Sequence, residues 1–322
     1  MTSTEIMHGP TQLYFANDIL LLVNGNNRCL RLLMLILIDS QIVSGQEISV
    51  AKSKIFRSSI PLTRRSCAVE IFGFKEGKFP ETYLGIPLMQ GKVTKQAIFP
   101  LIEKIKNRAN NCTCSMISFQ GWVTLAKSVL NNIPIHNMAV YKWPHSLIKE
   151  GDNILRNFIW TGDPIKRKGV TLKWGKVCKP IKEGGLGVCS LGEVNNAMLC
   201  KLHWVIKQGT KDWALFLKSK FSSKTRDTIH YHKPSTIWFG IQTGAAPSKP
   251  CIGCLIGHGK KIDFWRDTWA TEIPLMEYIK LPRHMWKLCT SRLNNFISPQ
   301  GWQFPNDIHL LLLALGINVQ QL

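Results

Sequence analysis

The sequence predicts an α+β protein: a small β-hairpin near the N-terminus, a mainly α-helical middle, and a short C-terminal region of irregular and β structure. Three observations predict this. Two apolar runs flank a polar pair at 17–18, apolar residues recur at helical spacing from 91 to about 210, and Gly, Pro and Trp become frequent after 233. The 322 residues, 45% of them apolar, are enough for about two domains with a sizeable core.

The first 90 residues carry the expected β elements. Residues 11–24 read as strand, tight turn, strand, because Asn17 and Asp18 tolerate the positive φ that a two-residue hairpin turn requires. A helix is expected from Cys29 to about Val43, with Gly45 at its C-terminal cap. Two further strand-like runs, 67–74 and 81–88, are separated by a basic turn that contains glycine.

The middle of the chain is expected to be an array of helices. Pro100 suits the first turn of a helix, and the apolar residues after it have helical spacing. After residue 233 we expect loops and short strands, for example at 241–250 and 256–265, and a final helix within 307–322. The helices expected in the middle are 100–109, 120–132, 145–159 and 191–206.

The charge distribution predicts a polyanionic partner. The formal net charge is +21, and residues 52–233 hold 31 basic and 11 acidic groups. A basic surface of this kind most often meets nucleic acid phosphates. The start of the chain has no secretory signal pattern, and the apolar stretch Leu30–Ile38 is too short to span a bilayer. We therefore expect no membrane partner and an intracellular protein, in the nucleus or the cytoplasm, whose ten cysteines are reduced thiols.

Several motifs in order resemble one known family. The hairpin Tyr14–Asp18, with sequence YFAND, is similar to the F-A-D-D hairpin of reverse transcriptases, in particular the LINE-type (non-LTR) enzymes of plant retroelements. The resemblance extends to about residue 270, and the ordered set is more specific than any single motif. The further matching segments are Ser44-Gly45 with Lys52-Ser53, YLGIPL at 83–88, GWVTLAKSVL at 121–130, FIWTG at 158–162, GGLG at 184–187 and FWRDTW at 264–269.

The resemblance implies a division of the chain into four parts. Residues 1–90 would be the remnant of a polymerase palm, 91–165 a helical thumb-like region, 166–232 a basic helical connector, and 233–322 a C-terminal region rich in Gly and Trp. In the family, the segment matching Tyr83, Leu84 and Gly85 helps to hold the primer end. These three residues are the expected primer-grip-like site.

The same resemblance locates the candidate catalytic residues and shows a departure. Nucleotidyl transfer uses two Mg²⁺ ions, which need anionic oxygen ligands. The family supplies adjacent hairpin aspartates and another on an earlier palm strand, which this sequence does not show before its hairpin. Here Asn17 stands where the first hairpin Asp belongs, and only Asp18 remains, at best as a weak Mg²⁺ ligand. We expect Mg²⁺ as the family cofactor, no productive binding of it, and no polymerase activity.

Nucleic acid binding does not depend on those carboxylates. Basic residues that precede the helical middle, lie on its first helix, or follow Trp160 are expected to bind RNA or an RNA–DNA hybrid without sequence preference. The alternative is a solvated basic face with no specific ligand. Core packing is expected for most of the eleven tryptophans, and we assign base stacking to none by number. The candidate residues are Lys52, Lys54, Arg57, Arg64, Arg65, Lys104, Lys106, Arg108, Lys166, Arg167, Lys168, Lys173, Lys176, Lys179 and Lys182.

Two other motifs allow more than one interpretation. Cys251, Cys254 and His258, with His284 and Cys289, resemble part of a zinc site, but their spacing matches no zinc finger, so plain thiols are favoured and zinc is not expected. The glycines of 184–187 lack the following Lys and Ser or Thr of a P-loop, and a turn explains them.

Three interpretations of function remain open from the sequence. The first is a portion of a retroelement reverse transcriptase that is inactive and binds RNA, with a complementary polymerase half as a further partner if one exists. The second is a decayed retroelement reading frame with no selected activity. The third is a basic structural or zinc-binding protein. An isolated palm hairpin would expose apolar surface and strand edges, so residues 1–90 should fold less stably than the helices of 91–210.

Overall fold

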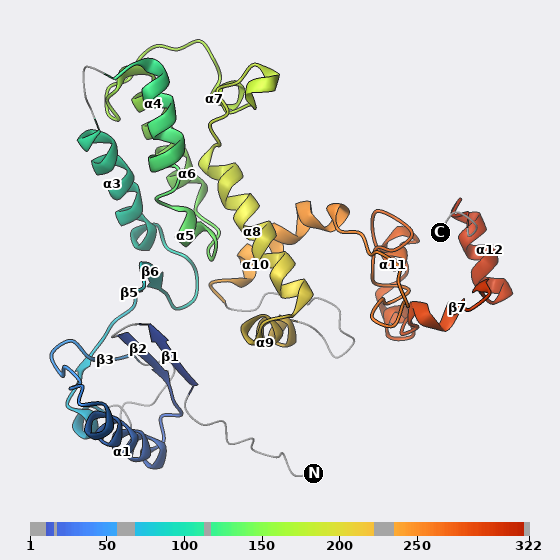
Figure 1. Ribbon diagram of the computed structural model, residues 1–322, viewed down its shortest axis with the longest axis horizontal. Coiled ribbons are helices and arrows are strands. Elements are labelled where there is room, and N and C mark those ends of the chain that lie inside the picture. Colours follow the sequence, from blue (N-terminus) through green and yellow to red (C-terminus); the bar gives the residue numbers. More distant parts are fainter. Residues whose placement is uncertain (1–10, 16–17, 57–67, 113–116, 222–234, 319–322) are drawn as a thin grey trace. The chain divides into compact units, whose positions relative to one another are not determined.

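The computed structural model describes residues 11–15, 18–56, 68–112, 117–221 and 235–318 (Figure 1). The chain divides into two compact units, Met1–Tyr83 and Leu84–Leu322. Helices predominate, and the strands form small two-stranded sheets near the two ends of the described chain. The predicted α+β class, with a β-hairpin first and a mainly helical middle, is confirmed.

The first unit begins with the predicted hairpin and helix. The antiparallel pairing places Phe15 opposite Asp18, and the two residues that separate them in the sequence, Ala16 and Asn17, lie outside the described residues. The helix starts at the cap Asn26, whose Oδ1 accepts the N–H of Cys29 at 2.7 Å, and it ends at Gly45, where φ is 68°. The elements of this unit are β1 (Thr11–Phe15), β2 (Asp18–Leu22), α1 (Asn27–Ser44), β3 (Lys54–Ile55), β4 (Lys75–Glu76) and β5 (Glu81–Tyr83).

The strand predicted over 67–74 is wrong, because residues 68–72 are helical. Ala68 and Phe72 are four residues apart, which places both on one helix face against Leu30 and Leu33 of α1. An apolar run of this length is compatible with a strand and with a short buried helix, so the sequence alone does not distinguish them. The packing against α1 favours the helix, because it buries two residues four positions apart. Residue 75 begins β4, which pairs in parallel with β3.

Much of α1 has no apolar cover from the described residues of its unit. Within the helix only Leu30 and Leu33 are buried, whereas Ile42 and Val43 are 76% and 88% exposed. Leu32 and Leu35 are more than half exposed on the same helix. Among the described residues, one small apolar cluster therefore holds this unit together.

The second unit has a larger core. It is built mainly from α3, α4, η1 and α6, and its fully buried side chains include Ile102, Leu130, Trp143 and Phe158. The elements up to the last long helix are β6 (Ile86–Leu88), α3 (Lys95–Asn111), α4 (Phe119–Leu125), the π-helix η1 (Ala126–Leu130), α5 (Ile135–Met138), α6 (His145–Thr161), α7 (Trp174–Val177), the 3₁₀ turn η2 (Ile181–Glu183), α8 (Leu191–Gln208), α9 (Asp212–Phe221) and α10 (Trp238–Ser248).

The predicted helices of the middle are present, with one start that differs. The first of them begins at Lys95, capped by Thr94, and Pro100 lies inside it rather than in its first turn. The segment expected at 120–132 is α4 continued by one π-helical stretch. The other two expected helices, 145–159 and 191–206, match α6 and α8 to within two residues at each end.

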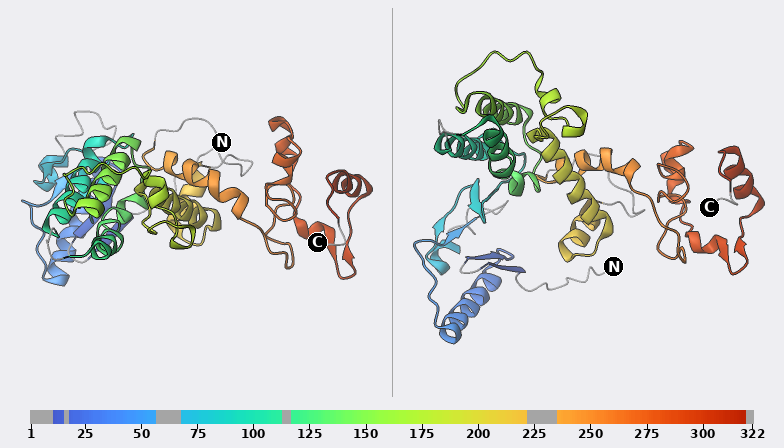
Figure 2. Two further views of the ribbon diagram at one scale, coloured as in Figure 1. Left: turned by 90° about the horizontal axis from the view of Figure 1, so that it is seen from above. Right: turned by 45° about the horizontal axis from the view of Figure 1, so that its top comes forward.

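The loop predicted at 241–250 is wrong, because most of it belongs to α10. This helix packs against α8 (Figures 1 and 2), and α8 and α10 make the most extensive helix contact of the unit. At Gly244 an added Cβ would lie 2.2 Å from the carbonyl oxygen of Leu199, so the glycine allows the two backbones to approach. Close helix packing therefore explains a composition that resembles a loop.

The C-terminal part of the second unit has its own aromatic core. Phe264 is fully buried and contacts Trp265, Trp269, Phe296 and Phe304 through ring centroids 4.7 to 6.1 Å apart. Short strands and a final helix surround it, as predicted for this region. They are α11 (Leu275–Tyr278), the 3₁₀ turns η3 (Lys249–Cys251), η4 (Arg283–Lys287) and η5 (Leu293–Phe296), strands β7 (Ile297–Ser298) and β8 (Gly301–Trp302), and α12 (Asn306–Ala314).

A buried carboxamide joins α8 to the segment between α5 and α6. Asn195 is fully buried; its Nδ2 donates to the carbonyl oxygens of Met138 at 3.0 Å and Tyr141 at 2.8 Å, and its Oδ1 accepts the N–H of Trp143 at 3.0 Å. Met138, Tyr141 and Trp143 are themselves buried, so solvent does not take the place of this partner, and the side chain fixes the start of α6 relative to α8.

We predict that Asn195→Ala destabilises the protein by about 3 kcal/mol, because it leaves buried backbone groups of 138, 141 and 143 without a partner. The matched control is Asn196→Ala. The neighbouring Asn196 is exposed and only accepts from Lys142 Nζ at 2.9 Å, so its loss should cost less than about 0.5 kcal/mol. Urea unfolding of both variants checks this, and equal losses would contradict the role given to Asn195.

Candidate nucleic-acid interface

A basic loop leaves the C-terminal end of α6. The helix stops at Gly162, where φ is 72°, and the Oδ1 of Asp163 then accepts the N–H groups of Ile165 at 2.7 Å and Lys166 at 3.2 Å. The carboxylate of Asp163 thus accepts hydrogen bonds from the backbone of its own turn. Lys166, Arg167 and Lys168 follow this turn directly and are all exposed. The loop therefore presents three cations next to a carboxylate that forms no ion pair with them.

The chain then folds back on itself through the predicted glycine turn. Leu186 N–H donates to the Val177 carbonyl at 2.8 Å, and Gly187 N–H donates to the Lys179 carbonyl at 2.9 Å. Gly184 has φ of 82°, and a Cβ on Gly185 would lie 2.0 Å from the Lys179 carbonyl oxygen. The N–H groups of 183–187 are donated to the chain's own carbonyls, so these glycines shape a turn and form no phosphate loop.

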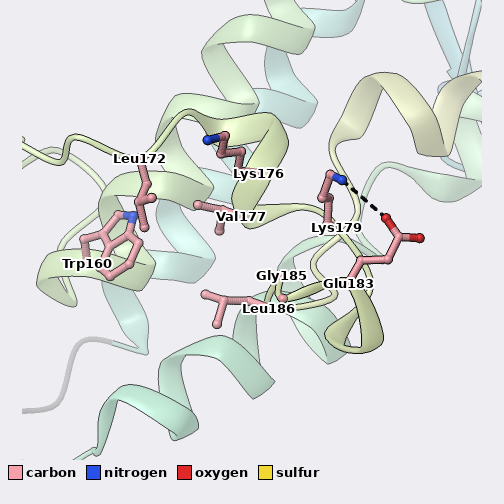
Figure 3. Close-up of a pocket in the computed structure, with 9 residues that line it drawn as sticks. Trp160, Leu172, Lys176, Val177, Lys179, Glu183, Gly185 and Leu186 are labelled. Atoms are coloured by element: carbon pink, nitrogen blue, oxygen red, sulfur yellow. Dashed lines mark hydrogen bonds and ion pairs between the residues drawn. The ribbon is translucent and has the colours of Figure 1, made fainter.

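This turn and the end of α6 enclose a pocket of about 360 Å³ (Figure 3). In the close-up, Trp160 and Leu172 lie at one end, Val177 and Leu186 lie in the middle, and Lys179 with Glu183 lies at the other end. Lys176 borders the same cavity. The pocket thus has an apolar end, an end formed by the Lys179–Glu183 ion pair, and one unpaired cation, Lys176, at its border.

Most of the basic side chains between residues 163 and 187 form no ion pair. Within 163–187, a stretch that is described throughout, Lys179 alone forms an ion pair, with Glu183 at 3.4 Å. Both of these side chains are more than half exposed, so the pair contributes little stability. The cations without an ion pair in this stretch are Lys166, Arg167, Lys168, Lys173, Lys176 and Lys182.

Beneath the turn lie two groups whose charged forms are disfavoured. Burial raises the pKa of the Asp152 carboxyl, whose Oδ1 accepts the Leu191 N–H at 2.9 Å. Burial, together with the carboxylates of Asp152 and Glu193 and the thiol of Cys189, raises the pKa of Cys178 to about 12. Cys178 is therefore a protonated thiol at neutral pH and no nucleophile.

The other predicted binding residues are arranged as follows. On α3, Lys104 and Arg108 are exposed, and Lys106 is half-buried, with its Nζ 3.9 Å from Glu103. In the first unit, Lys52 is exposed, while Lys54 is held by Glu81 at 2.6 Å. Arg57, Arg64 and Arg65 lie outside the described residues. The second unit therefore provides most of the described cations of the candidate set.

The candidate catalytic hairpin provides one described carboxylate. Asp18 opens β2 and is exposed, and its partner in the motif, Asn17, lies outside the described residues. Across the described parts of the chain, no group of three or more His, Cys, Asp or Glu residues could hold a metal ion, and this includes the residues of the cysteine and histidine motif near 251–289. The weak Mg²⁺ site and the expectation of no zinc stay predictions.

The primer-grip-like segment lies where the first unit ends and the second begins. Tyr83 ends β5, and Leu84 and Gly85 form a turn with positive φ values of 51° and 79°. The Leu84 carbonyl oxygen lies 3.2 Å from Nε2 of His136, and Tyr141 donates its hydroxyl to the Pro87 carbonyl at 3.1 Å. Sequence reasoning missed both partners, because nothing in their local pattern marks residues more than 50 positions away.

Sequence reasoning also missed the pocket. Trp160 packs partly against the core, as expected for most of the tryptophans, but it also lines the cavity together with Leu172 and Lys176. The signal that could have drawn attention to it is the glycine turn at 184–187, which brings the chain back to Val177 and Lys179, two other residues of the lining.

The comparisons with known proteins agree with a plant relationship. The chain is 32% identical over 225 residues, 68% of its length, to an Arabidopsis thaliana protein described as "Putative ribonuclease H protein", and it spans 36% of that relative. It is 28% identical over 148 residues, 44% of its length, to an "Uncharacterized mitochondrial protein" of the same plant, 96% of which is covered. No protein-family pattern matches the chain. The chain is thus a basic, mainly helical relative of these two plant proteins.

Membrane crossing requires a helix that is both long and apolar. Among the helices of the described ranges, none meets both requirements.

We predict that Gly185→Ala destabilises the protein by roughly 2–4 kcal/mol, because the new methyl group meets the backbone carbonyl of Lys179 and no flexible side chain can yield. Gly175→Ala, at an exposed position of α7, has nothing within 4 Å of the added carbon and should leave stability unchanged or slightly higher. Thermal unfolding of both variants tests the turn. A harmless Gly185→Ala would mean that the two backbone segments do not approach closely.

Proposed function

We propose that this chain is a portion of a LINE-type reverse transcriptase that binds RNA or an RNA–DNA hybrid through its phosphates and does not transfer nucleotides. The observation that carries the binding proposal is the stretch 163–187, in which six exposed cations have no ion pair and Asp163 is engaged by its own turn. Such cations displace the counterions of a nucleic acid backbone, and they do so without reading bases. The ordered motifs and the plant relatives support the retroelement origin.

The absence of nucleotidyl transfer follows from the donors at the hairpin. A pair of Mg²⁺ ions needs several anionic oxygens, and the motif here offers the carboxylate of Asp18 and the neutral amide of Asn17. An amide oxygen can coordinate a cation but does not offset its charge. The donor set therefore does not fit the family's two-metal centre, and we derive no catalytic step through it.

A second candidate is a decayed reading frame without selected binding, and one observation favours it. The first unit leaves Ile42, Val43, Leu32 and Leu35 of α1 exposed, which is costly for a protein that acts alone. A complementary polymerase portion would cover such a surface in the first candidate. Cooperative unfolding combined with RNA binding supports the first candidate, whereas an aggregating product that binds no RNA supports the second.

We predict that affinity for a single-stranded RNA falls steeply with salt, and that Lys166→Gln/Arg167→Gln/Lys168→Gln lowers the slope of log K against log[salt] by about 2, because each lost phosphate contact removes about 0.7. A triple variant with the same charge change elsewhere, Lys260→Gln/Lys261→Gln/Lys287→Gln, should keep the slope. Fluorescence anisotropy from low to physiological salt measures both. A flat salt dependence of the unaltered protein would refute the phosphate account.

We also predict no incorporation of labelled nucleotide on a primed RNA template, with a full-length relative as the positive control. Asp18→Ala should be indistinguishable from the unaltered chain, because one carboxylate does not support the two-metal reaction. Incorporation above the Asp18→Ala background would overturn the assignment.

A further inference from the structure

The pocket beside Trp160 is too apolar at one end to be a phosphate site alone. Trp160, Leu172, Val177 and Leu186 supply its apolar lining (Figure 3). Of its two lysines, Lys179 is paired with Glu183 at 3.4 Å and Lys176 forms no ion pair, so Lys176 supplies the unpaired charge. The volume of about 360 Å³ lies at the small end of the range for ligand pockets. A ligand that matches this lining has a flat apolar part and an anionic part.

Trp160 supplies the flat part of this lining. Its ring lies 5.3 Å from that of Phe119, centroid to centroid, which supports it within the core, and it lines the cavity as well. The indole Nε1 has almost no accessible surface and no hydrogen-bond partner among the described residues, so the ring meets the cavity through its carbon atoms. The ligand that suits this end therefore has a flat apolar face.

The glycine turn excludes one alternative. A free inorganic anion is usually held by several backbone N–H groups, but those of 183–187 already donate to carbonyls of the same chain. Only lysine ammonium groups remain for an anion, and one of the two, that of Lys179, is already paired with Glu183. The apolar lining would then have no role.

We propose that this pocket takes one unpaired nucleobase of a single strand, packed against Trp160 and Leu186, with its phosphate at Lys176. A base offers a flat face for stacking, and its phosphate matches the ammonium group of Lys176, which forms no ion pair. This inference rests on the proposed binding function. It adds a defined site for one base to an interface that otherwise holds only the backbone.

The test compares two strands of ten units with the full chain. One strand is fully abasic, and the other is abasic except for a single central 2-aminopurine, a fluorescent base that stacking quenches. We expect the one-base strand to bind about tenfold more tightly, with quenching of the base. Equal affinity without quenching would refute the pocket but keep phosphate binding, whereas failure of both strands to bind would refute the proposed function itself.

A variant at the apolar end separates the pocket from the rest of the surface. Leu172 is 50% exposed, so Leu172→Glu should fold, and it should remove the tenfold gain and the quenching. The matched control is Leu215→Glu on α9, which is 51% exposed and changes charge equally, and it should retain both. A tenfold gain that survives Leu172→Glu would overturn the assignment of the site.

A third arm distinguishes a strand from a free nucleotide. Free 2-aminopurine riboside monophosphate should bind at least tenfold more weakly than the one-base strand, since it lacks the neighbouring phosphates for Lys166 to Lys168. Equal binding of the free nucleotide would overturn the strand assignment. If an acidic peptide displaced the one-base strand and no competing nucleic acid did, the pocket would belong to a protein partner. That result would also overturn the strand assignment.

Discussion

The carboxamide of Asn195 is the interaction on which the second unit depends most. It satisfies three buried backbone groups around the start of α6 from one position on α8. The same corner contains a second buried amide, because Trp143 Nε1 donates to Asn137 Oδ1 at 2.6 Å. Since neither helix can shift without leaving buried polar groups unpaired, the direction of α6 is set here. The end of α6 then carries Trp160 and releases the basic loop.

Two glycines allow close packing along the same helix. Gly151, inside α6, lies against Leu191, where an added Cβ would come within 2.4 Å of the leucine side chain, so α6 and the start of α8 are in close contact. Just after the C-terminal end of α6, Gly162 lies against the ring of Trp122, and its positive φ of 72° starts the loop. The basic loop therefore leaves a helix that is closely packed both midway along its length and at its C-terminal end.

Helical periodicity allows most of this core to be predicted, because α6 and α8 bury one face each and the pattern shows it. The errors come from residues whose meaning depends on a distant partner or a competing cap. Pro100 suits a helix start, yet Thr94 provides the cap and the proline lies within α3. Gly244 indicates a loop by its composition, yet it lies against Leu199 in a helix pair. The pocket could not be predicted, since it joins the end of α6 to a turn some twenty residues later.

The two chemistries of the proposed ancestor differ in how much change they tolerate. A two-metal centre needs several carboxylates within a few ångströms, so one amide in place of Asp at position 17 is sufficient to spoil the donor set. Phosphate binding needs only exposed cations on a stable support, and each cation adds its share nearly independently. The support here is the well-packed core of the second unit, whereas the hairpin belongs to a unit in which the described residues form one small apolar cluster. The proposed binding would therefore outlast catalysis, because the proposed function that tolerates substitution lies on the more extensively packed part.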